Sequence, residues 1–317
     1  ELLGNYGQGG NCGYGRRFLY HNSFLIADQQ SAWVLETAGE YWAAARVHDF
    51  KAISNSLSLG SDFDRAHPRL VEHAISKGWC RSSQDFHFAR CYTNPLITRF
   101  SGAHERCACN QDWLTQAQGK IDAAVLMTAL RSHHPQDQAG ALRGSSVRSV
   151  CMHGGGLIGD HTTGSYVADL SKTTCTYWVT GSSTPCLSTF KPLWLDMAAE
   201  LMPEENNFAE ALEFWYQREV LNRAILQGQL PEVDKYLQKR DALENNWLQN
   251  ASHLTLSDLK PRQELMAQAW REEAALVDST LGTISSQPKR PGSFLYRSYW
   301  QRQTQKLTHE RQHPHIF

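Results

Sequence analysis

Apolar residues gather in short runs over the first sixty residues, with polar breaks between the runs. This pattern predicts strands at 24–28, 33–39, 41–47 and 50–59. The short links between successive runs favour an antiparallel meander. Runs such as FLIA and AWVL are apolar at nearly every position instead of alternating with polar residues. We therefore expect a sheet that is covered on both faces.

Beyond residue 60, helical and strand-like patterns alternate. Helical spacing and good helix formers predict helices at 67–78 and 120–133. Residues 81–118 are polar and contain cysteines, and they are predicted to be irregular. Further strands are predicted at 165–170, 175–181 and 188–195.

The pattern changes after residue 200, where long amphipathic and charged segments replace the short apolar runs. They predict helices at 206–228, 231–250, 257–279 and, after the linker SSQPKRPGS, at 294–307. The tail from residue 309 is expected to be disordered. Strands, helices, strands and then a helical third indicate the α+β class.

Composition narrows the functional classes. The net charge of −1 favours neither a nucleic acid nor an anionic membrane as a partner. No apolar run approaches the roughly 18–20 residues that cross a bilayer. The eight cysteines lie in a chain long enough to build a core without disulfides, so we expect reduced thiols and a cytoplasmic location. The CAC at 107–109 lacks the CxxC spacing of metal or redox sites, and we interpret it as two loop thiols.

Seven segments in order carry a resemblance to a known family. They are YGQGGN, NSFLIAD, AWVLETAGEYWAAARV, ISNSLSLGSDFD, VCMHGGG, TTGSYVADL and YWVTGSSTPCLSTFKPLWL. Over about residues 5–225 the chain resembles the secernin-type dipeptidases, which are cysteine N-terminal-nucleophile hydrolases. The resemblance implies a four-layer αββα sandwich. It also implies an N-terminal cysteine whose thiolate attacks a peptide amide, with the α-amino group as the base.

The resemblance implies that the nucleophile lies in an N-terminal segment outside this sequence, which starts at Glu1. We therefore expect a sandwich that lacks its first strands. Cleavage after Asn11 would expose Cys12 as an alternative nucleophile, but Cys12 precedes the strands that match the middle of the fold. We interpret Cys12 as a loop cysteine beside glycines.

We expect three parts: a partial αββα hydrolase core at 1–200, a helical region packed on it at 201–284, and a linker, short helix and tail at 285–317. The predicted function is that of the C-terminal portion of a cysteine-type dipeptidase that acts on small peptides and is inactive by itself. No cofactor, nucleic acid or membrane partner is expected, and the oligomeric state is left open. The alternatives are a non-catalytic secernin-like interaction protein and a metal-binding protein that uses the 151–161 loop.

Asn55 is the predicted catalytic residue. It follows an expected strand, and the resemblance implies that its amide stabilises the oxyanion of the tetrahedral intermediate. A turn-forming asparagine is the alternative interpretation. His21, Asn22 and His153 are predicted to bind substrate, and ordinary strand-entry or loop roles remain open for them.

Other polar residues have simpler interpretations. Glu36 is expected to pair with Arg46 on a neighbouring strand. His133 and His134 end a predicted helix and are interpreted as surface residues.

The glycine-rich loop after residue 150 carries side chains that can bind a metal. They are Cys151, His153, Asp160 and His161. A site for zinc needs four convergent ligands, and the glycines weaken their preorganisation. We therefore assign no metal to the chain.

Overall fold

The structure is a computed structural model, and it describes residues 21–93, 101–156, 159–170, 174–197, 208–287 and 292–312. The chain divides into two compact units, residues 1–118 (unit 1) and 119–317 (unit 2). This division falls after Gln118, whereas the predicted helical region begins at residue 201. Each unit contains one antiparallel sheet and several helices.

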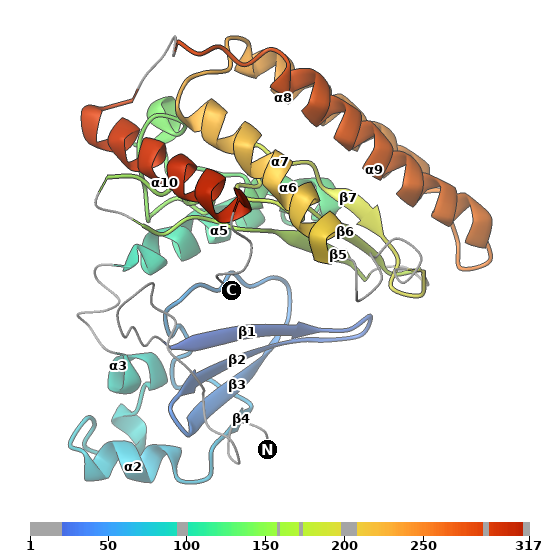
Figure 1. Ribbon diagram of the computed structural model, residues 1–317. Coiled ribbons are helices and arrows are strands. Elements are labelled where there is room, and N and C mark those ends of the chain that lie inside the picture. The colour runs from blue at the N-terminus through green and yellow to red at the C-terminus, as the bar shows by residue number, and fades with distance from the viewer. Residues whose placement is uncertain are drawn as a thin grey trace. The chain divides into compact units, whose positions relative to one another are not determined.

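Unit 1 contains a four-stranded meander, drawn in blue in Figure 1. Consecutive strands pair in antiparallel fashion, which confirms the predicted meander. The register sets Ser23 opposite Glu36, and Glu36 opposite Ala43. The strands are β1 (Asn22–Ala27), β2 (Ala32–Ala38), β3 (Tyr41–Val47) and β4 (Arg65–Ala66).

The prediction of a sheet covered on both faces is wrong for β1. Phe24, Leu25 and Ile26 are 41%, 51% and 54% exposed, although they alternate between the two faces of the strand. Within the described residues, β1 hydrogen-bonds only to β2 and forms one edge of the sheet. The inner strands are covered better, with Val34 and Ala43 almost fully buried. The apolar composition of a strand therefore does not by itself predict whether both of its faces are buried.

Two further predictions for unit 1 are wrong. Residues 50–59 do not form a strand, because only an isolated bridge joins Ser54 and Ser56. Within 81–118, the described residues include helical segments at 83–85, 88–92 and 103–116, so the prediction of an irregular segment is wrong, and CAC lies in a helix. The helices of unit 1 are α2 (Leu70–Ser76), the 3-10 turn η1 (Ser83–Asp85), α3 (Phe88–Tyr92) and α5 (Ala103–Gln116).

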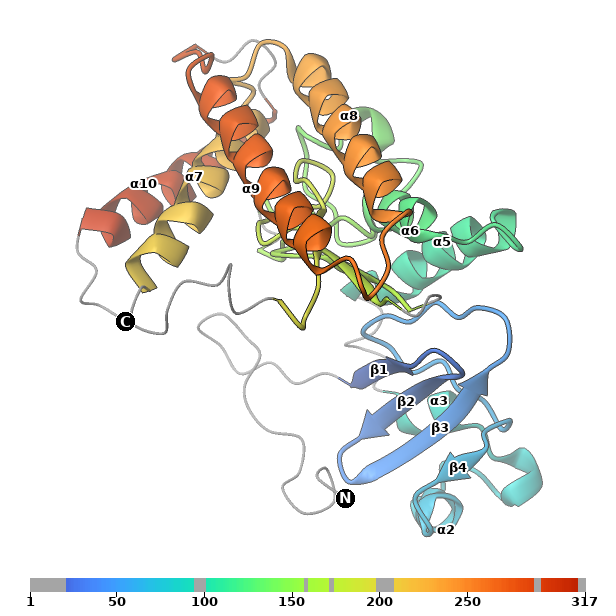
Figure 2. The same ribbon diagram turned by 90° about the vertical axis from the view of Figure 1, so that its right-hand side faces the viewer.

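Unit 2 contains a three-stranded antiparallel sheet with helices packed against it (Figure 1). Its strands, β5 (Tyr166–Asp169), β6 (Thr176–Val179) and β7 (Lys191–Leu193), confirm the three predicted segments. Helix α6 contacts β5, while α8 and α9 contact β7 and each other. Helices α7 and α10 lie side by side (Figure 2). The helices are α6 (Ala123–Leu130), the 3-10 turn η2 (Gln138–Gly140), α7 (Phe208–Leu226), α8 (Val233–Ala251), α9 (Leu259–Leu281) and α10 (Phe294–Gln312).

The core of unit 2 joins its sheet to its helices. Trp178 and Phe190 from the sheet pack with Trp247 of α8 and Met266 of α9. Burying side chains of this size contributes about 1.5–3 kcal/mol each. Helices α8 and α9 of the predicted helical region therefore pack against β7. Helix α10 extends to Gln312, so the predicted disorder is wrong for residues 309–312, and the rest of the tail lies outside the described residues.

A charged group is buried within this apolar core. The Lys191 ammonium on β7 is fully buried, 3.6 Å from the Glu273 carboxylate of α9. Arg218 of α7 donates a hydrogen bond from Nε to Glu273 Oε1 at 2.8 Å. The ammonium also donates to the Thr180 carbonyl at 2.9 Å. Pairing is required here because an isolated buried charge is strongly destabilising.

The two antiparallel sheets and the helices that accompany them fit the predicted α+β class. Among the described residues, none of the helices combines the length and the apolar character needed to cross a membrane.

Candidate functional site

Glu36 organises the polar end of the unit 1 sheet. Its carboxylate is fully buried and accepts hydrogen bonds from the Ser58 amide at 2.7 Å and the Leu59 amide at 2.9 Å. The Ser58 hydroxyl donates to the same carboxylate at 2.7 Å, and the Ser23 hydroxyl donates at 3.3 Å. Hydrogen bonds to a charged acceptor are stronger than neutral ones. Glu36 therefore holds the 54–59 segment against β1 and β2.

The predicted ion pair between Glu36 and Arg46 is wrong. In the register of β2 and β3, Glu36 lies opposite Ala43, whereas Arg46 lies opposite Trp33. Ala43 and Arg46 are three positions apart along the strand, so these two side chains point to opposite faces of the sheet. The Glu36 carboxylate accepts instead from neutral donors of the 58–59 backbone and nearby hydroxyls.

Asn55 lies in the segment that Glu36 holds, exposed to solvent. Its side-chain oxygen accepts a hydrogen bond from Arg106 Nη2 of helix α5 at 3.0 Å. Arg106 is itself buried and donates to the Ser101 carbonyl at 2.6 Å. Because the oxygen is occupied by Arg106, the amide NH2 group of Asn55 is the part that is oriented to donate.

His21 and Asn22 lie at the start of β1, near this segment. Ser23 links the strand to the segment, because its hydroxyl lies 3.3 Å from the Ser56 carbonyl. Side chains alternate along a strand, so Asn22 points to the face opposite Ser23 and Glu36. Burial lowers the pKa of His21, and the nearby Glu36 carboxylate partly opposes this shift. Of the two residues, His21 is therefore the one beside Glu36.

A second polar site lies in unit 2, where four side chains that can bind a metal converge. The Nε2 atom of His153 lies 3.4 Å from His133 Nε2, 3.6 Å from Cys151 Sγ and 3.2 Å from Cys186 Sγ. All four ligand atoms lie within 4.8 Å of one another. We call the four residues the Cys2His2 cluster: His133, Cys151, His153 and Cys186.

Local structure positions the two histidines of the cluster. His133 follows the C-terminal end of α6, and its ring packs edge-on against the His153 ring at 5.0 Å. His153 is fixed by a bridge between its backbone and Ser146. Its Nδ1–H donates to the Ala141 carbonyl at 2.5 Å, which leaves Nε2 as the atom that faces the cluster. The prediction of His133 as a surface residue is wrong, because its ring lies against a buried histidine.

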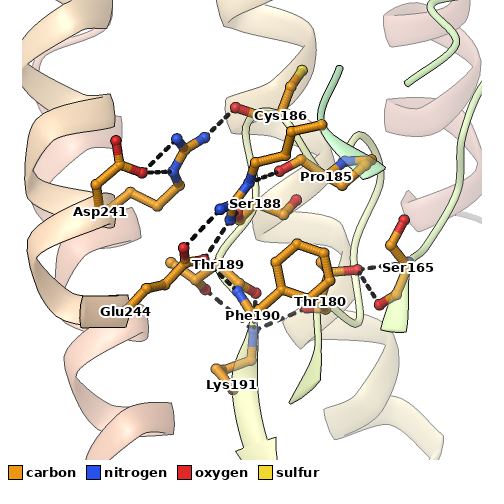
Figure 3. A network of polar contacts seen from close by, with 12 residues as sticks. Ser165, Thr180, Pro185, Cys186, Ser188, Thr189, Phe190, Lys191, Asp241 and Glu244 are labelled. Carbon is orange, nitrogen blue, oxygen red and sulfur yellow. Dashed lines mark hydrogen bonds and ion pairs between the residues drawn. The ribbon is translucent and has the colours of Figure 1, made fainter. Parts of the chain in front are cut away.

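The segment that carries Cys186 is anchored by a network of charged side chains (Figure 3). Arg131, which caps α6, donates to the Pro185 carbonyl at 2.8 Å and to the Ser188 carbonyl at 2.9 Å. The same guanidinium pairs with Glu244 of α8. Arg240 of α8 donates to the carbonyl of Cys186 itself. These contacts connect the end of α6, two residues before His133, to the backbone around Cys186.

Thr184 introduces a sharp turn two residues before Cys186. Among the described residues, Thr184 is the one residue other than glycine whose backbone φ is positive, at 52°. Its amide donates to the Thr162 carbonyl at 2.8 Å, and its hydroxyl to Asn222 Oδ1 at 3.3 Å. A β-branched residue is rarely found in this conformation, so the surrounding contacts must hold it there.

The electrostatics of the cluster favour an ionised thiol. Burial alone would raise the pKa of Cys186, but the hydrogen bond with Cys151 and the charge of His153 hold that pKa well below its usual value. Burial raises the pKa of Cys151 well above its usual value. Burial would lower the pKa of His153, yet the neighbouring Cys186 thiolate raises it overall. The pKa of the Cys186 thiol is thus lowered, and that of His153 raised, where the two side chains meet.

Two loop residues that were considered as metal ligands do not belong to the cluster. Asp160 is exposed. His161 accepts a hydrogen bond from the Gly154 amide through Nδ1 at 3.0 Å, and its ring packs against Trp300. Burial lowers the pKa of His161 to about 3, which keeps it neutral. The other two ligands of the cluster are His133 and Cys186, which lie outside the 151–161 loop.

A cavity of about 380 Å³ adjoins the cluster and is lined in part by His133, Cys151 and His153. The predicted substrate-binding residue His153 therefore lines a cavity, but in unit 2, whereas His21, Asn22 and Asn55 belong to unit 1. Asp137 also lines the cavity, with its carboxylate bound to Arg148 at 2.7 Å and to the Ser146 hydroxyl at 2.5 Å.

Comparison with known proteins adds no family assignment: no protein-family model matches this chain, and no solved structure matches it. Cys12, the alternative nucleophile, lies outside the described residues.

Proposed function

We propose that this chain is the C-terminal portion of a cysteine-type dipeptidase of the secernin kind, built on an αββα sandwich. In this proposal an N-terminal cysteine outside these 317 residues forms the acyl-enzyme, and water then hydrolyses it. The substrate is a small peptide. Unit 1 supplies the polar wall at which the tetrahedral intermediate is stabilised.

The observation that carries the proposal is the orientation of Asn55. Arg106 occupies the amide oxygen of Asn55 at 3.0 Å, and the exposed NH2 group is left to donate to a developing oxyanion. A donor of this kind is effective only when it is held in place before the reaction. The backbone that follows Asn55 is fixed by the Glu36 carboxylate, which accepts from the Ser58 and Leu59 amides.

The test uses the protein with its nucleophile-bearing segment included. We expect Asn55→Ala to lower kcat for dipeptide hydrolysis by about 10²–10³-fold, the usual effect of losing one oxyanion donor. KM should change much less, because the contact forms mainly in the transition state. Asn245→Ala, at an exposed position of α8, is the matched control and should retain full activity.

The proposal of catalysis fails if replacing the nucleophilic cysteine by alanine leaves the rate of dipeptide hydrolysis unchanged. The assignment of Asn55 fails separately if Asn55→Ala matches the Asn245→Ala control.

A second candidate function, a non-catalytic interaction protein, is favoured by the exposed strand β1. Phe24 and Ile26 are exposed on one face of this edge strand and Leu25 on the other, and exposed apolar side chains of this kind are found where protein partners bind. A protein that bears its N-terminal cysteine and still cleaves no dipeptide would favour this candidate.

A further inference from the structure

We propose that the Cys2His2 cluster is a structural zinc site of unit 2. This inference goes beyond the proposed hydrolase, and it departs from our expectation from the sequence that the chain has no metal. It depends on residues of unit 2 alone, whereas the proposed oxyanion donor belongs to unit 1. Each proposal can therefore fail without the other.

The separations between ligand atoms match tetrahedral zinc. With bonds of about 2.0–2.1 Å to nitrogen and about 2.3 Å to sulfur, tetrahedral angles place the ligand atoms about 3.3–3.8 Å apart. From His153 Nε2, the separations to His133 (3.4 Å) and Cys151 (3.6 Å) lie in this range, and the separation to Cys186 is slightly shorter at 3.2 Å. All four ligand atoms lie within 4.8 Å of one another, so small shifts bring two nitrogens and two sulfurs onto one zinc ion.

The groups around the ligands also suit a metal. The Nδ1–H of His153 donates to the Ala141 carbonyl, which fixes the tautomer with Nε2 available for the ion. The carboxylate of Asp137, the nearest acidic group in the adjoining cavity, is already held by Arg148 and Ser146. Among the described residues, the cluster therefore presents four ligands without a carboxylate beside them. The cavity beside His133 gives an ion a route from solvent.

The types of ligand atom indicate which metal the cluster binds, and their number indicates the role of that metal. Thiolate sulfur with imidazole nitrogen is typical of zinc, whereas magnesium and calcium prefer oxygen ligands. Four protein ligands leave no open position for substrate or water, which is the pattern of structural zinc. The ion would join three separate segments: the end of α6 through His133, the 146–153 bridge through Cys151 and His153, and the anchored turn through Cys186.

Two other uses of the same residues make different predictions. A disulfide between Cys151 and Cys186 would leave the histidines unused, and both cysteines are reduced in the structure. A reactive thiolate at Cys186 paired with His153 would use two of the four side chains and leave Cys151 and His133 without a role. Zinc binding uses all four side chains at once.

Elemental analysis tests the proposal on the full 317-residue chain, produced with zinc and a reductant and then dialysed against metal-free buffer. We expect one equivalent of zinc per chain. Cys186→Ser should lose it, because the substitution removes a thiolate ligand. Cys175→Ser is the matched control, since Cys175 is a partly buried cysteine of unit 2 outside the cluster, and it should keep its zinc.

Replacement of zinc by cobalt supplies a readout that does not depend on any variant folding. Cobalt(II) in the wild-type chain should give the strong visible absorption of tetrahedral coordination, together with thiolate-to-cobalt charge-transfer bands. Folded wild-type protein that binds no zinc, or a cobalt spectrum without thiolate bands, overturns the proposal. So does a Cys186→Ser variant that retains as much zinc as Cys175→Ser, or a Cys151–Cys186 disulfide in protein purified under reductant.

Discussion

Glu36 of unit 1 and Glu273 of unit 2 are both buried, and their carboxylates are stabilised by different means. Glu36 in unit 1 accepts hydrogen bonds from two backbone amides and two hydroxyls. Glu273 in unit 2 lies between two cations, Arg218 and Lys191. The first carboxylate fixes a backbone segment close to its own strand, whereas the second connects side chains of α7, α9 and β7.

The difference shows two ways to position a site. Amide donors are built into the backbone, so Glu36 determines the path of the 54–59 segment and with it the place of Asn55. Cations are carried on long side chains, so Glu273 ties together elements that are far apart in the sequence. Breaking a buried ion pair leaves uncompensated charges, which is more destabilising than losing hydrogen bonds to neutral donors.

The largest expected effect is that of Glu273→Gln. The substitution keeps the shape of the side chain but leaves Lys191 and Arg218 buried without a counter-charge. We expect unit 2 to lose about 3–5 kcal/mol of free energy of unfolding, measured by hydrogen exchange of its core amides. Glu264→Gln, which removes an exposed pair with Lys260, is the control and should change stability by less than about 1 kcal/mol. Equal protection in the two variants would contradict the role of the buried ion network.

A smaller effect is expected for Glu36→Gln, because an amide NH2 group replaces one acceptor oxygen and faces the Ser58 and Leu59 amides. We expect a loss of about 1.5–3 kcal/mol in unit 1, with the 54–59 amides exchanging faster. Glu72→Gln, at an exposed position of α2, is the control. If the 54–59 amides keep their protection, neutral donors do not hold this segment and the comparison between the two units fails.

The smallest expected effect is that of acid on unit 2. Burial opposes ionisation of Glu273, but the charges of Lys191 and Arg218 lower its pKa below the ordinary 4.5. A lowered carboxyl pKa stabilises the fold above the unfolded-state value, and this contribution is lost as the pH falls through the folded-state value. Unit 2 should therefore lose stability below about pH 4.5 in denaturant titrations. Glu273→Gln should lose less stability over the same range, and an identical pH dependence would contradict the assigned shift.

Local pattern was enough to predict most elements but not their limits. Strands β1–β3 and β5–β7 and the helices after residue 200 follow from apolar runs and helical spacing. The predicted strand at 50–59 fails because the amides of Ser58 and Leu59 bind Glu36 instead of a neighbouring strand. Helix α5 was missed because its hydrophobic face is weak: among its fourteen residues, only Ala103, Arg106 and Leu114 are buried.

The candidate site residues were predictable only where they are close in sequence. Asn55 was named from the sequence, but its partner Arg106 lies fifty-one residues away and carries no local signal. Cys151 and His153 were recognised as potential ligands because they share one loop. His133 and Cys186 were not, because the fold brings them there through Arg131, Arg240 and Glu244.

The positive φ of Thr184 has a consequence for the rate at which an ion is exchanged. Contacts to Thr162 and Asn222 hold this unusual conformation, so the turn before Cys186 is set by the fold itself. A ligand mounted on such a turn cannot swing away from the ion by a simple rotation of its backbone. Release of a bound ion would first require the turn to open, and exchange with free metal in solution would then be limited by that local unfolding.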